Sequence, residues 1–169
     1  PEWNSPVLFR RAEFHEQNTS SFNICHGFVE GRSPISNAQQ HLNKKFTLSI
    51  DLKDFFDTVT PELLKRAGIK DEWADKACYL GTTKQGLSSS PAAANCAAIP
   101  MDKKILEVIW QKNIIYTRYA DDLSFSSDNL QDLLILRDDK LPKIITECGF
   151  TINNKKTRIQ SSKFGRRII

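Results

Sequence analysis

Residues 113–127 read NIIYTRYADDLSFSS, and this stretch decides the fold. Two runs rich in apolar and aromatic residues, Asn113–Tyr119 and Leu123–Ser127, flank the tripeptide Ala-Asp-Asp at 120–122. Such β-prone runs joined by a short polar segment predict a β-hairpin. Asp-Asp pairs are common in surface turns because Asp tolerates turn geometry. An exposed hairpin does not need so much apolar material on both sides, so the flanks favour a buried hairpin with a functional acidic turn.

Strand and helix signals alternate on both sides of the hairpin. Residues 46–50 (FTLSI) alternate apolar and polar side chains, which predicts a strand that ends at Asp51. Residues 129–148 carry an amphipathic pattern that predicts a helix, kinked or restarted at Pro142. The other predicted elements are a helix from Thr60-Pro61 to Gly68, a short helix over 71–80, a long helix over 91–112 with a kink at Pro100, and a last strand over 157–161.

The predicted order of elements is strand, helices, strand, strand, helix and strand. This order is typical of an α+β fold of the ferredoxin-like split βαβ kind, whose antiparallel sheet carries helices on one face. The first strand and the hairpin can then lie side by side, so Asp51, Asp121 and Asp122 converge. Carboxylates that are close together repel one another and lose hydration, so a protein keeps such a cluster when a cation neutralises it.

Magnesium fits a carboxylate cluster of this kind. It prefers oxygen ligands, and it is commonly held by one or two carboxylates together with substrate phosphates. Two such ions about 4 Å apart hold both the attacking and the leaving oxygen of a phosphoryl displacement. The three aspartates therefore favour metal-assisted transfer of a phosphoryl or nucleotidyl group.

The bulk composition argues against several classes of protein. With 169 residues, the chain is expected to form one domain. Its four cysteines form no CxxC pair, which argues against a zinc site and a disulfide framework and indicates a reducing compartment. No apolar run approaches the roughly 20 residues of a membrane span, and no signal peptide is visible at the start. We therefore expect a soluble cytoplasmic protein with no membrane partner.

The net charge of +4 is unevenly distributed along the chain. Residues 151–169 contain six positive side chains and no acidic one, so the rest of the chain is slightly acidic. A cationic segment on such a body favours contact with a polyanion. A solvated tail explains the same charges equally well.

Five segments resemble, in the same order, the motifs of prokaryotic reverse transcriptases of the retron and group II intron-like type. Residues 46–59 (FTLSIDLKDFFDTV) resemble the first catalytic motif, and residues 116–127 (YTRYADDLSFSS) match the YxDD motif. The other three segments are 26–42 (HGFVEGRSPISNAQQHL), 83–97 (TKQGLSSSPAAANCA) and 149–158 (GFTINNKKTR). The resemblance implies a polymerase palm domain over 46–169, a partial fingers and connecting segment over 1–45, and no thumb.

The resemblance also implies roles in the chemistry. Asp51 and Asp121 are the main ligands of two Mg²⁺ ions, with Mn²⁺ as an alternative, and Asp122 supports them; these three are the catalytic residues. The backbone carbonyl of Leu52 helps to hold the second ion. Lys156 lies near the leaving pyrophosphate as an electrostatic stabiliser or acid. The alternative for Lys156 is a solvated surface lysine, and the two interpretations carry equal weight.

A second group of positions is implied to contact the nucleotide and the nucleic acid. Backbone N–H groups around Asp54 and Phe55 meet the triphosphate, and the ring of Phe56 excludes a 2′-hydroxyl and so selects deoxynucleotides. Core packing is the alternative for both rings. Gln85 and Gly86 line the nucleotide pocket, where Gly86 allows close backbone approach. Candidates for contact with nucleic-acid phosphates are Arg32, Arg118, Lys155 and Arg158.

The sequence also departs from the family pattern. Lys84 replaces the usual proline before Gln-Gly, and the basic fingers segment is unclear before Cys25, where Arg10 and Arg11 match poorly. Three functions stay open. The first is an RNA-directed DNA polymerase that uses an RNA template, a DNA or RNA primer and dNTPs, with a cognate noncoding RNA as a further partner. The second is a template-independent DNA polymerase of a prokaryotic antiviral defence system. The third is an inactive palm fragment that binds nucleic acid or serves in assembly.

Overall fold

A computed structural model describes residues 24–164, without the side chain of Phe164. Its centre is a four-stranded antiparallel sheet with the strand order β2-β3-β1-β4. The first strand therefore lies beside the second strand of the hairpin, and the expected split βαβ order is confirmed. The strands are β1 (Phe46–Asp51), β2 (Ile114–Tyr119), β3 (Asp122–Ser127) and β4 (Arg158–Ser161).

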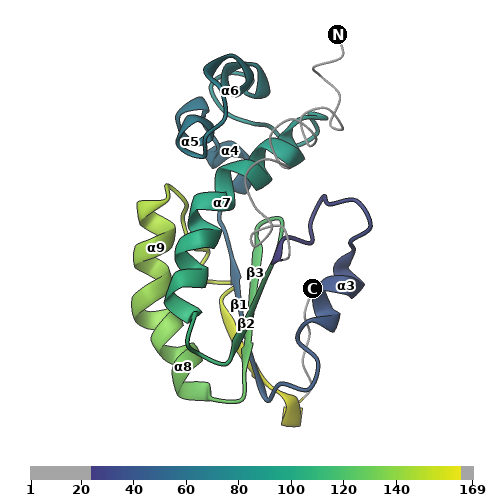
Figure 1. The fold of residues 1–169 in the computed structure, drawn as a ribbon, viewed down its shortest axis with the longest axis vertical. Helices are drawn as coiled ribbons and strands as arrows, with labels where there is room; N and C mark the ends of the chain where they lie inside the picture. Colours follow the sequence, from purple (N-terminus) through teal and green to yellow (C-terminus); the bar gives the residue numbers. More distant parts are fainter. Residues whose placement is uncertain (1–23, 165–169) are drawn as a thin grey trace.

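Three helices cover one face of this sheet (Figure 1). The helices α7 (Ser90–Ile109), α8 (Leu130–Ile135) and α9 (Leu141–Glu147) lie on one side of the strands, and α3 (Pro34–Gln39) lies on the other. No helix of the described residues is long and apolar enough to cross a bilayer. Three short helices contact α7 at one end of the molecule: α4 (Phe55–Thr58), α5 (Pro61–Arg66) and α6 (Asp71–Ala77).

The face of the sheet under α7, α8 and α9 is apolar. Leu48 of β1, Phe125 of β3 and Tyr116 of β2 stand side by side across three strands, and all three are buried. The rings of Tyr116 and Phe125 stack with centroids 4.7 Å apart. Because side chains alternate between the two faces of a strand, this row places Asp51 and Asp122 on the opposite face.

The opposite face is polar, yet much of it is buried. Thr117, Ser124 and Ser126 point to this side and are almost fully enclosed. The segment around α3 covers part of this face, and His41, just after α3, bridges two strands. Its Nδ1 lies 2.7 Å from the Ser126 hydroxyl and its Nε2 lies 2.7 Å from the Thr117 hydroxyl. Segment 24–45 is therefore bound to the sheet through polar contacts.

The long helix expected from Pro91 is present: α7 runs from Ser90 to Ile109 with Pro100 inside it, and the kink expected there stays a prediction. The helix expected over 129–148 is interrupted by a π-helical segment, Leu136–Lys140, and restarts with Pro142 in the first turn of α9. The restart at Pro142 is confirmed.

The helices α3 and α4 were not predicted. The sequence did hold a signal for α3, since Ser33 caps it in a capping box and Pro34 occupies the first turn. The predicted cap at Thr60 of α5 is confirmed, because its side chain accepts a hydrogen bond from the Leu63 amide. The predictions for residues 1–23, including Arg10 and Arg11, lie outside the described residues.

Candidate active site

The acidic turn lies directly against the end of β1. Asp51 stands opposite Asp122 in the antiparallel pairing of β1 with β3. The amide of Leu52 donates a hydrogen bond of 2.9 Å to the carbonyl of Asp121. Ala120, in the two-residue turn, has a left-handed backbone with φ of 56°. The approach of Asp51 to the Asp-Asp pair, predicted from strand order, is confirmed.

Asp51 is held by the loop that follows α9. Asn153 donates from Nδ2 to Oδ1 of Asp51 at 2.9 Å, and Lys156 donates from Nζ to Oδ2 at 3.0 Å. The backbone amide of Asn153 also donates to the Asp51 carbonyl at 2.8 Å. Lys156 thus lies at the carboxylates, and its place near a leaving pyrophosphate stays a prediction. The role of Asn153 was not predicted, although this residue stands only three residues before Lys156 in the same motif.

The carboxylates of the turn are electrostatically strained. Burial, and then the charges of Asp121 and Asp51, raise the pKa of Asp122 to about 6. Burial and the Asp51 charge also raise the pKa of Asp121. The hydrogen bond to Asp51 and the Asp51 charge raise the pKa of Lys156, which therefore stays protonated. The group carries excess negative charge that a single ammonium does not neutralise.

The chemistry of these donors suits a hard cation. Within residues 24–164, no group of three or more His, Cys, Asp or Glu side chains is gathered closely enough to hold a metal ion. Mg²⁺ is commonly held by one or two carboxylates, and substrate phosphates supply its remaining ligands, so the chemistry of these donors still suits it. The ligand roles of Asp51, Asp121 and Asp122 stay predictions. Both oxygens of Asp51 already have hydrogen-bond partners, so an ion there must compete with Lys156.

Arg118 does not lie where a phosphate could reach it. Its side chain and that of Asp102 are 0% exposed, and the pair is joined at 2.8 Å between Nη2 and Oδ2. Burial, the largest cause, lowers the pKa of the guanidinium, but the charge of Asp102, the charge of Cys25 and the hydrogen bonds to Asp102 together keep the pKa above its ordinary value. The expected contact of Arg118 with nucleic acid is therefore wrong, because the strand turns this side chain into the core.

Arg118 instead connects the core to the acidic turn. Its Nη1 donates to the Ala120 carbonyl at 3.3 Å and to Oδ1 of Asn95 at 2.9 Å. Asp102 also accepts a hydrogen bond of 2.7 Å from the Tyr116 hydroxyl. The buried polar network of Tyr116, Arg118, Asp102 and Asn95 thus joins α7 to the backbone of the turn.

A loop at residues 25–28 packs against the other side of the turn. The His26 amide donates to the Arg118 carbonyl at 2.8 Å, and Asn95 Nδ2 donates to the Gly27 carbonyl at 2.8 Å. A Cβ at Gly27 would lie 2.4 Å from the backbone nitrogen of Ala120. Only glycine therefore allows this loop to approach the turn so closely.

The residues expected to bind the nucleotide surround α4. Asp54 precedes α4 with a left-handed φ of 49°. Phe55 is buried and packs on Phe150 with centroids 5.7 Å apart, so its core alternative is confirmed. Phe56 is only partly buried and contacts Phe55 on one side and Phe28 on the other. Phe56 thus has an accessible surface that Phe55 lacks.

The loop with Gln85 and Gly86 is fastened to α4. Thr83 donates from its hydroxyl to the Phe56 carbonyl at 2.6 Å, and Lys84 Nζ lies 2.6 Å from Oδ1 of Asp57. Gly86 has a φ of 95°, and a Cβ there would meet nothing within 4 Å. The glycine therefore serves the turn conformation rather than a close contact within this chain.

The other basic residues predicted to contact nucleic acid are Arg32, Lys155 and Arg158. Arg32 donates from Nη1 to the Cys25 carbonyl at 2.7 Å, which supports the 25–28 loop. Lys155 and Arg158 are exposed, before and within β4. All three remain candidates for contact with nucleic acid.

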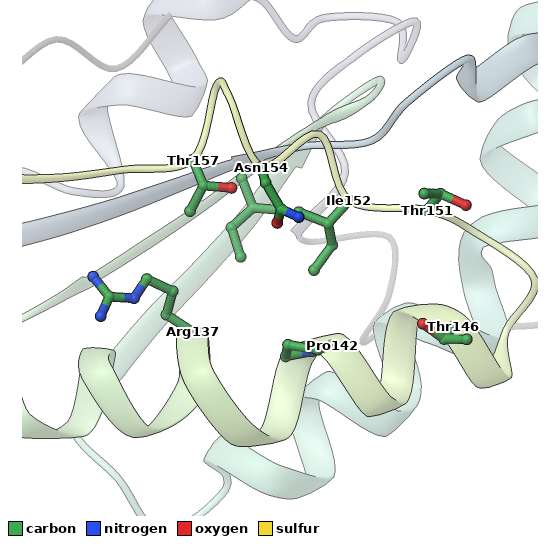
Figure 2. A pocket seen from close by; sticks show the side chains of 8 residues that line it. Arg137, Pro142, Thr146, Thr151, Ile152, Asn154 and Thr157 are labelled. Carbon is green, nitrogen blue, oxygen red and sulfur yellow. The ribbon is translucent and has the colours of Figure 1, made fainter.

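An open pocket of about 250 Å³ lies elsewhere, between the helices and the loop before β4 (Figure 2). Arg137 and Pro142 line it from the helical side, and Ile152 and Asn154 line it from the loop. Ile152 and Asn154 flank Asn153, whose side chain reaches Asp51 instead. The pocket contains none of the predicted site residues.

Comparison with known proteins places this geometry in a family. A model of the family "Reverse transcriptase (RNA-dependent DNA polymerase)" matches residues 9–165. The chain is 34% identical over 159 residues to the retron Ec86 reverse transcriptase of Escherichia coli, covering 89% of this chain and 49% of that protein. It is 32% identical over 162 residues to the retron Mx65 reverse transcriptase of Myxococcus xanthus, covering 80% and 38%. The chain thus spans about half or less of the length of these relatives.

Solved structures with a similar fold include telomerases. Telomerase from Candida albicans, in complex with a fragment of telomeric RNA, matches with a TM-score of 0.66 at 11% identity over 96% of this chain and 34% of that one. Apo telomerase from Candida tropicalis matches with a TM-score of 0.66 at 12% identity over 95% and 37%. At such low identity these likenesses show a shared fold. The family model and the retron relatives show that the chain belongs to the reverse transcriptase (RNA-dependent DNA polymerase) family.

Proposed function

We propose that this chain carries the catalytic palm of an RNA-directed DNA polymerase, which adds a deoxynucleotide to the 3′-hydroxyl of a primer. The observation that carries the proposal is the pairing of Asp51 with Asp122 across adjacent strands, with the Asp121 carbonyl fixed by Leu52. This pairing brings Asp51 and Asp122, which are 71 residues apart in sequence, to one edge of a sheet. The electrostatic repulsion among these carboxylates favours the binding of a cation at the site.

In this proposal Asp51, Asp121 and Asp122 are the metal ligands, together with the carbonyl of Leu52. Bound Mg²⁺ or Mn²⁺ would supply charge stabilisation for the attacking and leaving oxygens. Lys156 holds a protonated amine at the carboxylate edge, where it can neutralise or protonate a leaving pyrophosphate. Asn153 orients Asp51 by occupying one of its oxygens.

The nucleotide lies over α4 in this proposal. The backbone at Asp54 and Phe55 meets the triphosphate, and the partly exposed ring of Phe56 lies under the sugar. Gln85 and Gly86 form the neighbouring wall, which Thr83 and Lys84 fasten to α4. A rigid wall is required because steric exclusion of a hydroxyl works only if the excluding ring stays in place.

We further propose residues 46–169 as the palm and residues 1–45 as part of the fingers and connecting segment. An RNA template, a DNA or RNA primer and dNTPs are then the substrates, and Arg32, Lys155 and Arg158 are candidates for phosphate contact. Similarity to retron reverse transcriptases makes a cognate noncoding RNA a proposed partner.

The test is primer extension on an RNA template with dNTPs and Mg²⁺, comparing the wild type with Asp121→Ala. Asp139→Asn is a matched control, because Asp139 is a surface carboxylate paired only with nearby lysines. We expect extension by the wild type and the control but none by Asp121→Ala. Extension that persists in Asp121→Ala would refute the metal site. Incorporation without a template would instead support a template-independent polymerase, and no incorporation at all would support an inactive palm.

A further inference from the structure

Phe28 has two features that a surface loop residue rarely combines. Its backbone is left-handed, with φ of 58°. Its side chain is 42% exposed although it is a large aromatic ring. A left-handed backbone is unfavourable for a bulky residue and persists only when the surroundings enforce it. The structure around Phe28 therefore enforces a conformation that presents its ring to solvent, which is typical of a functional position.

The surroundings that enforce this conformation belong to the acidic turn. The preceding residue, Gly27, is pressed against the backbone of Ala120, and its carbonyl accepts a hydrogen bond from Asn95. The amide of His26 is bonded to the Arg118 carbonyl at 2.8 Å. The position of Phe28 is thus determined by the same strand and turn that carry Asp121.

The ring of Phe28 meets the ring of Phe56. Their centroids are 6.0 Å apart with an interplanar angle of 59°, which is a favourable geometry for two aromatic rings. Behind Phe56 stands Phe55 at 5.6 Å, and behind Phe55 stands Phe150 at 5.7 Å. Phe55 and Phe150 are buried in the core. Four rings therefore form a row that is anchored at one end and closed by Phe28 at the other.

This row bears on how Phe56 can exclude a 2′-hydroxyl. A ring supported on one side only can rotate away from an added hydroxyl group, because side-chain rotations are fast and inexpensive at a surface. The Phe55 ring restrains Phe56 from the core side. Phe28 restrains it from the side of the catalytic turn.

From these contacts we infer that Phe28 is a positioning residue that holds the Phe56 ring in place and so sets the discrimination between deoxyribonucleotides and ribonucleotides. The inference rests on the proposed function, in which Phe56 lies under the sugar. Phe28 acts through Phe56, so its loss affects ribonucleotide rejection more than deoxynucleotide incorporation.

The test measures kcat/KM for a dNTP and for the rNTP with the same base, in the wild type and in Phe28→Ala. The ratio of the two values is the readout, because partial unfolding lowers both values together and leaves the ratio unchanged. We expect the ratio to fall by about tenfold, the scale on which small changes in pocket shape alter discrimination. Phe28→Tyr, which keeps the ring, should retain the wild-type ratio. Ile35→Ala, at a side chain of α3 that is 70% exposed, is the matched control and should also leave it unchanged.

Two further variants separate this inference from the proposed function. Phe56→Ala should lower the ratio at least as much as Phe28→Ala, and Phe28→Ala should add nothing in a Phe56→Ala background, because both act through one ring. If Phe56→Ala leaves the ratio unchanged, the proposed role of Phe56 fails and this inference fails with it. If Phe56→Ala lowers the ratio but Phe28→Ala does not, this inference alone is overturned.

Discussion

Replacing Asp102 with Asn should strongly destabilise the protein and weaken its acidic turn. Asp102 accepts three contacts from the Arg118 guanidinium, from Nε at 3.0 and 3.1 Å and from Nη2 at 2.8 Å, and one from the Tyr116 hydroxyl. Asn removes the negative charge, and its amide N–H group would face the Arg118 guanidinium and the Tyr116 hydroxyl, which are themselves hydrogen-bond donors. The variant therefore leaves the charge of Arg118 buried and uncompensated.

The expected cost follows from the burial of the pair. Both side chains are 0% exposed, so solvent does not screen their interaction. Removing one partner of a buried ion pair costs about 3–5 kcal/mol, which is a large part of a typical stability of about 5–15 kcal/mol. For a domain of this size such a loss lowers Tm by about 6–20 °C.

The assay is thermal unfolding, followed by primer extension at a temperature where the variant is folded. Asp139→Asn removes an exposed carboxylate and should leave Tm nearly unchanged. The double variant Asp102→Leu with Arg118→Met removes both charges and should recover much of the stability. It should not recover activity, because the Ala120 carbonyl and Asn95 lose their donor. A Tm of Asp102→Asn within about 1 °C of the wild type would refute the reasoning.

Three other changes have defined outcomes. Asp122→Asn should abolish primer extension in Mg²⁺ and, in EDTA at pH 7, should raise Tm. Because the folded pKa of about 6 exceeds the ordinary 3.8, this carboxylate destabilises the folded state above pH 6 and ceases to do so as pH falls towards 4, so the gap in Tm should close by pH 4. Gly27→Ala should cost about 1–3 kcal/mol in urea unfolding and reduce extension, since its Cβ meets the backbone of Ala120. Asn153→Ala should lower kcat/KM or Mg²⁺ affinity by about 10–100-fold, and unchanged kinetics would remove its orienting role.

The parts of the site that depend on strand order could be predicted from the sequence. A strand that ends in Asp51 and a hairpin that turns at Asp121 become neighbours in one sheet topology, and residue alternation then fixes which face they share. The lysine motif could be placed only through resemblance. Its contact with Asp51 spans 105 residues, and no local pattern determines a loop contact at that separation.

The error at Arg118 was avoidable in part. In β2, Ile114, Tyr116 and Arg118 fall on one face by simple alternation, and that face is buried. A buried arginine requires an acidic partner, and Asp102 directly follows the apolar residues 96–101 of α7. The burial of Arg118 and the presence of Asp102 could therefore be predicted from the sequence, but their pairing could not. The contacts of Asn95 and Gly27 carry no comparable signal, because both depend on how the 25–28 loop approaches the turn.

Backbone strain is concentrated around the candidate site. Of the five non-glycine residues with positive φ in the described part of the chain, three lie there: Ala120 in the turn, Asp54 before α4 and Phe28 in the facing loop. The same region holds carboxylates with raised pKa values. Each feature raises the free energy of the folded state, and strain of this kind persists where the surrounding structure enforces it. The buried Arg118–Asp102 pair supplies that enforcement beneath the turn. A cation and substrate that relieve the charge repulsion should therefore stabilise the protein as they bind, through their preference for the folded state.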